Sequence, residues 1–266
     1  MIDNRIEVNK IFWEVQSNHL INQVYRGGKL IPSLTKLERF FAKNIKGKTL
    51  HPFCNFGMNT FCLETYSDSV IGLDFSSTSI SFANSYKKNI NSNVNFIESD
   101  FFKFNYSEKF DTIFMSYGVL DWVIDLDLFF NKVNELLNDD GQLIILEYHS
   151  NFYKELIKEF NAENISNNLY EITWGLKQYD TNSEKSIYGE GGVVKSENIK
   201  ARITLHDTDY FLQKSKEYGL KTEYIEYYDY LEFKQSANDT KISNSKYFKG
   251  EYKPNKNMIF GAILKK

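Results

Sequence analysis

The stretch TLHPFCNFGMNTFCLETYSDSVIGLD, residues 49–74, decides the fold of this chain. It predicts a strand over 49–53, a tight turn over 54–57, a short helix over about 58–66, and a second strand over 69–73. The second strand delivers Asp74 at its carboxyl end. Because ligands of parallel α/β sheets bind at the carboxyl ends of strands, we expect Asp74 to accept hydrogen bonds from both hydroxyls of a ribose.

The turn after the first strand contains one glycine, Gly57, preceded by Cys54, Asn55 and Phe56. A dinucleotide-binding fold uses three glycines there so that the backbone can approach a pyrophosphate. Three side chains would crowd a diphosphate, whereas S-adenosylmethionine carries no phosphate. The turn therefore favours S-adenosylmethionine over NAD. It also fits an ordinary strand–helix turn in which Gly57 supplies a positive φ.

Composition limits the class of protein. The chain has 266 residues, a net charge of −3, and 22 Phe and 18 Tyr, enough for one domain with a large aromatic core. The net charge leaves no excess of basic residues that would favour nucleic-acid binding. No apolar run is long enough to cross a membrane, and the N-terminal residues MIDNRIEV do not resemble a secretory signal. We therefore expect a cytoplasmic protein with Cys54 and Cys62 reduced and no metal, because these cysteines lack metal-like spacing with histidines.

The rest of the chain alternates helices and strands as far as residue 149. Apolar spacing predicts five further helices, over 33–45, from Ser76 or Ser77 to 88, and over 126–137, 151–162 and 208–218. Ser33 would cap the first of them and Asp207 the last. Strands are predicted over 94–97, 110–115, 143–146, 221–228 and 258–264. Continuous apolar strands indicate a parallel sheet covered on both faces. We expect a Rossmann-like α/β fold with a mostly parallel seven-stranded sheet and an antiparallel C-terminal edge hairpin. The single domain, 1–266, would include N-terminal lid helices over 1–32 and a small substrate-cap insertion over 150–204.

Four motifs of the chain, in their order along the sequence, resemble those of the class I S-adenosylmethionine-dependent methyltransferases. They resemble more closely the motifs of a bacterial subgroup that has L-H-L-Q-C-H-F-G in the first turn. The matching residues are Leu50-His51, Cys54, Phe56-Gly57 and Thr60; IGLDFS, 71–76; MSYGVLDWVIDL, 115–126; and Glu147-Tyr148-His149. Trp13, His19 and Tyr25 also fall where that subgroup has similar residues. The chain departs from the usual class I motif at His51, which stands where an acid is usual, and at two missing glycines.

This resemblance and the strand ends together predict the site residues. Asp100 would accept the adenine amino hydrogen or be a turn acid, Phe75 would lie against adenine or in the core, and Trp122 would wall the pocket or plug the core. His149, with Glu147 as its orienting partner, and Tyr117 are the catalytic candidates, although His149 fits an anchor for the cap loop equally well. The expected cofactor-binding residues are Tyr25, His51, Cys54, Asn55, Phe56, Gly57, Asp74, Phe75, Ser76, Asp100, Phe101, Ser116 and Tyr117, and the expected substrate-binding residues are His19, Trp122 and Trp174.

These features predict metal-independent transfer of a methyl group from S-adenosylmethionine to a small-molecule acceptor, at oxygen or nitrogen, by in-line displacement. Two other functions stay open at this point: a nicotinamide-dependent oxidoreductase, and a non-catalytic protein that binds S-adenosylmethionine. The sequence does not specify the acceptor or the oligomeric state.

Overall fold

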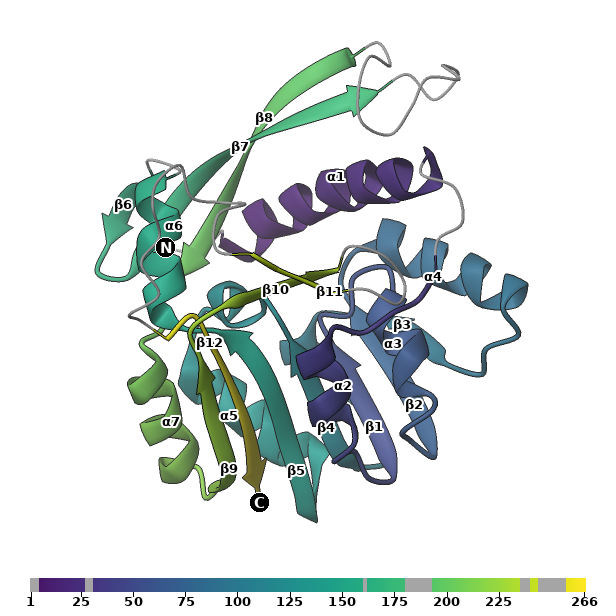
Figure 1. The fold of residues 1–266 in the computed structure, drawn as a ribbon, viewed down its shortest axis with the longest axis vertical. Helices are drawn as coiled ribbons and strands as arrows, with labels where there is room; N and C mark the ends of the chain where they lie inside the picture. The colour runs from purple at the N-terminus through teal and green to yellow at the C-terminus, as the bar shows by residue number, and fades with distance from the viewer. Residues whose placement is uncertain (1–4, 27–30, 160–161, 180–192, 235–239, 244–256) are drawn as a thin grey trace.

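The structure is a computed structural model and describes residues 5–26, 31–159, 162–179, 193–234, 240–243 and 257–266. A seven-stranded sheet forms its centre, in the order β3-β2-β1-β4-β5-β12-β9 (Figure 1). Its strands are β1 (Lys48–Pro52), β2 (Ser69–Asp74), β3 (Asn95–Glu98), β4 (Phe110–Ser116), β5 (Leu137–Tyr148), β9 (Lys221–Tyr228) and β12 (Ile259–Lys265). The first five pair in parallel, and β12 is antiparallel to both β5 and β9. The predicted mostly parallel sheet with an antiparallel C-terminal pair is confirmed.

Helices cover both faces of this sheet. Packed on one face are α2 (Lys36–Ala42), α3 (Met58–Leu63) and α4 (Ser77–Asn89), and on the other α5 (Leu126–Leu136), α7 (Thr208–Glu217) and the 3-10 turn η1 (Phe101–Lys103). Along β4, Ile113 and Met115 pack with Phe129 of α5, whereas Phe114 packs with Phe41 of α2. Successive side chains thus enter opposite cores, which is why the strand reads as a continuous apolar run.

The helix ends follow local capping chemistry. Thr35, not the predicted Ser33, caps α2: its hydroxyl accepts the N–H of Glu38 at 3.1 Å, and the Glu38 carboxylate accepts the N–H of Thr35 at 2.6 Å. The prediction at Ser33 was wrong because a Glu three residues after Thr35 completes a capping box there. Ser76 and Asp207 cap α4 and α7 as predicted.

The N-terminal segment, where lid helices over 1–32 were expected, forms one long helix, α1 (Arg5–Arg26). Figure 1 shows α1 between the carboxyl edge of the parallel strands and two long strands, β7 (Leu169–Tyr179) and β8 (Val193–Thr204). The Asn9 side chain donates to the carbonyl of Arg202 at 2.7 Å and accepts the N–H of Arg202 at 2.8 Å. This side-chain amide therefore ties α1 to the backbone of β8.

The remaining elements lie between β4 and α5, after β5, and near the C-terminus. They are α6 (Ser150–Glu159), β6 (Glu163–Ser166), β10 (Leu231–Lys234), β11 (Thr240–Ser243) and the 3-10 turn η2 (Leu120–Trp122). Strands β6, β7 and β8 form a separate antiparallel sheet, and β10 pairs with β11. The predicted insertion over 150–204 therefore corresponds to a helix and a three-stranded sheet.

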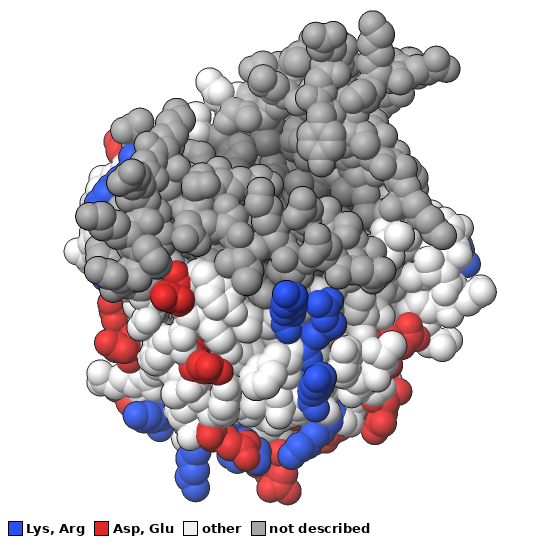
Figure 2. All heavy atoms as spheres, viewed as in Figure 1, with Lys and Arg blue, Asp and Glu red and all other residues white. Residues whose placement is uncertain are grey.

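The described surface carries charges of both signs. On the face shown in Figure 2, Lys and Arg side chains gather near α2, and acidic and basic side chains both occur around the lower rim. Of the helices in the described ranges, none combines the length and the apolar character needed to cross a bilayer.

Candidate active site

A cavity of about 220 Å³ lies at the carboxyl ends of β1, β2 and β4. The chain runs from β1 to β2 on one side and from β4 to β5 on the other, so the strand order reverses between β1 and β4. Such a reversal leaves a crevice in which open α/β sheets bind their ligands. The cavity is lined by Trp13, His51, residues 53–59, Asp74, Phe75, residues 116–119 and Trp122.

The turn after β1 folds tightly because three of its residues have positive φ. These are Phe53 (56°), Asn55 (50°) and Gly57 (83°). The Asn55 side chain accepts the N–H of Phe56 at 2.8 Å, and a Cβ at Gly57 would lie 2.5 Å from the ring of Phe96. Gly57 therefore supplies both the positive φ and the close approach, while the same turn lines the cavity.

Asp74 ends β2 with its carboxylate in the cavity wall. Its Oδ2 accepts the N–H of Asn55 at 2.8 Å, and its Oδ1 accepts the N–H of Ser76 at 2.9 Å. Burial raises the pKa of Asp74 to about 6 and the charge of Glu14 adds to the rise, although these two N–H groups oppose it. Each carboxylate oxygen can accept more than one hydrogen bond, so Asp74 retains capacity for a ligand's hydroxyls.

A second cavity, of about 210 Å³, adjoins the first and shares Phe53, Phe75 and Trp122 with it. Asp100 lies in its wall, at the end of β3. Its Oδ1 accepts the N–H of Phe102 at 3.0 Å, and its buried Oδ2 has no hydrogen-bond donor among the described residues. Lys103 lies 3.9 Å from that oxygen as an ion pair. The Oδ2 atom therefore keeps unused capacity to accept a hydrogen bond beside this cavity.

Helix α1 closes the first cavity with aromatic side chains. Trp13 lies edge-on to Trp122 with 5.1 Å between ring centroids, and Phe12 stacks on Trp122 at 5.5 Å. The carboxylate of Glu14 accepts the N–H groups of Ser77 and Thr78, at 2.7 and 3.3 Å, where α4 begins. Because one end of the contact is a helix N-terminus and the other an anion, it holds α1 over the site.

Several predicted residues lie away from the cavity walls. Phe101 is buried in the core, 5.3 Å from the Phe53 ring, so it backs a wall residue instead of forming the surface. Ser76 is fully buried, and its hydroxyl caps α4 by accepting the N–H of Ser79 at 3.2 Å. The side chains of His19, Tyr25 and Trp174 lie outside the described part of the chain.

His149 is not among the residues that line either cavity. Its Nδ1 accepts the N–H of Asn151 at 3.1 Å, at the start of α6, and burial lowers its pKa. Glu147, predicted to orient His149, instead accepts N–H groups of the chain after β4. His149 is thus not brought together with the other predicted residues, and its role as a base stays a prediction.

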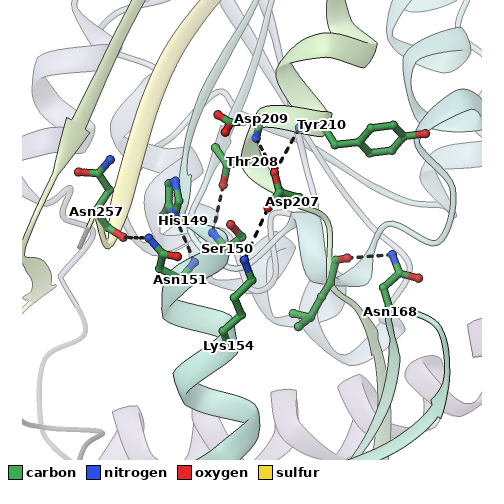
Figure 3. A network of polar contacts seen from close by, with 11 residues as sticks. His149, Ser150, Asn151, Lys154, Asn168, Asp207, Thr208, Asp209, Tyr210 and Asn257 are labelled. Carbon is green, nitrogen blue, oxygen red and sulfur yellow. Dashed lines mark hydrogen bonds and ion pairs between the residues drawn. The ribbon is translucent and has the colours of Figure 1, made fainter. Parts of the chain in front are cut away.

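Figure 3 shows the surroundings of His149 as a junction between α6 and α7. The N–H of Ser150 donates to the Thr208 hydroxyl at 3.0 Å, and Lys154 lies 3.6 Å from the carboxylate of Asp207. These contacts join the start of α6 to the start of α7. The alternative prediction, that His149 anchors the segment after β5, agrees with this arrangement.

The sequence alone does not reveal several cavity residues. Phe53, Met58 and Asn59 flank the first turn, and Gly118 and Val119 follow β4, but none has a side chain that signals a ligand. Asn59 donates to the Glu38 carboxylate and, at 3.4 Å, to the Ser116 hydroxyl, contacts that appear only after folding. In the sequence, only the position of these residues next to the quoted motifs indicated that they lie at the site.

Comparison with known proteins supports this description of the fold. A family model described as a methyltransferase domain matches residues 46–216, which include all five parallel strands, β1 to β5. The chain belongs to this methyltransferase family. No curated protein matches closely enough to add a further relative.

Solved structures share the fold, and methyltransferases are among them. A protein of Pyrococcus horikoshii, PH0226, is 19% identical, with a TM-score of 0.58 and coverage of 86% of this chain and 87% of its own. An S-adenosylmethionine-dependent methyltransferase of Clostridium acetobutylicum is 14% identical, with a TM-score of 0.59 and coverage of 94% and 98%. The glycopeptide N-methyltransferase MtfA, solved with S-adenosylmethionine, is 14% identical, with a TM-score of 0.53 and coverage of 87% and 86%.

Proposed function

We propose that this methyltransferase transfers the methyl group of S-adenosylmethionine to a small-molecule acceptor, at oxygen or nitrogen. The observation that carries the proposal is Asp74, whose carboxylate faces the cavity at the strand-order reversal and is fixed by the N–H groups of Asn55 and Ser76. A fixed carboxylate at the end of the second strand suits the paired hydroxyls of a ribose.

The two adjoining cavities fit the two ends of this cofactor. The Oδ2 atom of Asp100, which lacks a donor among the described residues, suits the adenine amino group, with Phe75 between the cavities against the ring. The turn around Gly57, with His51 and Ser116, would hold the methionine portion. His51 is already oriented, because its Nδ1 lies 2.8 Å from the Thr60 hydroxyl.

Bound S-adenosylmethionine supplies an electrophilic methyl group on a sulfonium, so the protein mainly has to position the acceptor in line with it. Trp13, Trp122 and Tyr117 give the first cavity an aromatic wall. Aromatic faces suit a planar or apolar acceptor and attract a cationic sulfur. Tyr117, at the end of β4, is the residue we assign to orienting the acceptor. His19 and Trp174 are proposed to complete the acceptor side and Tyr25 to contact the cofactor, with the insertion over 150–204 as the cap of the acceptor site.

Two features separate this proposal from a nicotinamide-dependent reaction. Asn55 and Phe56 line the cavity at the turn where a dinucleotide-binding fold has glycines that let the backbone approach a diphosphate. The solved glycopeptide N-methyltransferase with S-adenosylmethionine also shares the fold. The experiment is to incubate the protein with methyl-labelled S-adenosylmethionine and a cell extract, and to locate the label by mass spectrometry. Label in small molecules is expected, whereas label confined to protein or nucleic acid would contradict the proposed acceptor class.

A further inference from the structure

Glu147 lies near the end of β5, fully buried behind the cavity wall. Its Oε1 accepts the N–H groups of Gly118 at 2.6 Å and Tyr148 at 2.7 Å, and its Oε2 accepts those of Val119 at 2.6 Å and Leu120 at 3.0 Å. One buried carboxylate thus binds three consecutive N–H groups of the chain that follows β4. Hydrogen bonds to a charged acceptor are stronger than those between neutral groups.

The chain that Glu147 holds has a shape it would not readily adopt by itself. Tyr117 has a φ of 47° and Gly118 a φ of 73°, and a non-glycine residue in this left-handed region costs conformational energy. Tyr117, Gly118 and Val119 form part of the cavity wall, and Trp122 follows them. The wall therefore depends on a backbone conformation that surrounding contacts must support.

Two further buried groups support the carboxylate. The Tyr153 hydroxyl, from α6, donates to the Oδ1 of Asp121 at 3.2 Å and lies 3.4 Å from the Oε1 of Glu147. Burial raises the pKa of Asp121 to about 8, and the charge of Glu147 contributes. Asp121 is therefore about 90% neutral at pH 7 and about 10% neutral at pH 9. Its ionisation would place a second buried negative charge beside Glu147.

Other ionisable groups near η2 are engaged elsewhere. Strand β8 packs on η2, and its described basic side chains Lys200 and Arg202 both pair with Glu171. His206, which follows β8, makes its contact with the carbonyl of Val123 at 2.7 Å. Among the described residues, Glu147 and Tyr153 are thus the ionisable partners of Asp121.

We propose that Glu147 is a positioning residue for the cofactor cavity, with Tyr153 and Asp121 holding its carboxylate in place. This proposal rests on the proposed function, because the wall in question is that of the S-adenosylmethionine site. Glu147 does not line the cavity; it acts through the backbone N–H groups of 118–120. A preorganised wall lowers the conformational cost of binding a ligand.

The first test replaces Glu147 by Gln, which keeps the shape but turns an amide NH2 toward backbone donors. We expect Glu147→Gln to weaken the binding of S-adenosylhomocysteine, measured by titration calorimetry, by about ten-fold or more. Glu64→Gln is the matched control, because Glu64 accepts the N–H of Asn93 at 2.6 Å just before β3, at the opposite end of the strands. This control should bind within about two-fold of the parent, because Glu64 is half-buried at the end of the strands that lies away from the cavity.

The second test separates positioning from a general loss of stability. Raising the pH from 7 to 9 should weaken binding to the parent by up to about ten-fold more than binding to Asp121→Asn, which cannot ionise. A merely structural contact would give both proteins the same pH profile. The amino group of the ligand titrates equally in both experiments, so the difference between them reports Asp121.

Amide hydrogen exchange without ligand gives a third readout. The N–H groups of 118–120 should be protected in the parent and exchange faster in Glu147→Gln. Unchanged affinity and unchanged exchange in folded Glu147→Gln would overturn the proposal, as would parallel pH profiles of the parent and Asp121→Asn. If Glu147→Gln does not fold, the pH comparison decides. If the parent does not bind S-adenosylhomocysteine, the proposed function fails. The positioning role is then still tested by amide hydrogen exchange of the N–H groups of 118–120, which should be slow in the parent and faster in Glu147→Gln.

Discussion

Lowering the pH from 7 to 5 should weaken cofactor binding through Asp74. With a pKa of about 6, Asp74 is about 90% ionised at pH 7 and about 10% ionised at pH 5. The ionised carboxylate accepts hydrogen bonds from both ribose hydroxyls, whereas the protonated acid carries a hydrogen that competes with them. If only the ionised form binds, the affinity for S-adenosylhomocysteine falls about ten-fold, or about 1.4 kcal/mol.

The assay is titration calorimetry of the parent and of Asp74→Asn at pH 5, 6 and 7. The asparagine variant should bind more weakly at pH 7 by about 1.5–3 kcal/mol, the cost of losing a charged acceptor, and should show little further change at pH 5. Asp139→Asn is the control, because Asp139 is exposed and should leave the parent's profile intact. A parent affinity that stays constant from pH 7 to 5, or an equally steep fall in Asp74→Asn, would refute the reasoning.

Three further substitutions test other parts of the site. Gly57→Ala should lower the free energy of unfolding in urea by about 1–3 kcal/mol, because its φ is positive and its Cβ would meet the Phe96 ring; an unchanged midpoint would count against this. Trp122→Ala should weaken S-adenosylhomocysteine binding by about ten-fold or more through loss of the wall and of stacking on Phe12, and Trp122→Phe should recover most of it. His149→Ala should reduce stability by about 0.5–2 kcal/mol through loss of the contact with the Asn151 N–H, yet bind the ligand like the parent; selective loss of binding would return His149 to the site.

The sequence predicted the sheet well because its strands are buried on both faces. Continuous apolar runs such as Phe110–Ser116 have few alternatives to a central parallel strand. The C-terminal pair was also predictable, since two strand-like runs, 221–228 and 258–264, follow the last predicted helix. Helix boundaries were predicted less well. The helix predicted to end at about residue 66 ends at Leu63, and α2 is capped by Thr35 instead of Ser33. Capping depends on which local hydrogen bonds form in the folded chain.

The candidate site was predictable where function coincides with a strand end. The carboxyl ends of parallel strands meet at one edge of the sheet. For this reason the sequence predicted that the cavities would be lined by Asp74, Asp100 and Ser116, and all three line them. The same rule also pointed to His149, which follows β5; its imidazole accepts the N–H of Asn151 and it is not among the residues that line the two cavities, so its role as a base stays a prediction. Glu147 shows the limit of sequence reasoning, since its four N–H partners appear only when β4 and β5 lie side by side.

The most direct test of the central claim is calorimetric titration of the purified protein with S-adenosylhomocysteine and, separately, with NAD. We expect saturable binding of S-adenosylhomocysteine and none of NAD, because Asp74 lines the cavity beside a turn that carries Asn55 and Phe56 where a dinucleotide-binding fold has glycines. Binding of NAD alone would contradict the account and assign Asp74 to the ribose of a nicotinamide cofactor.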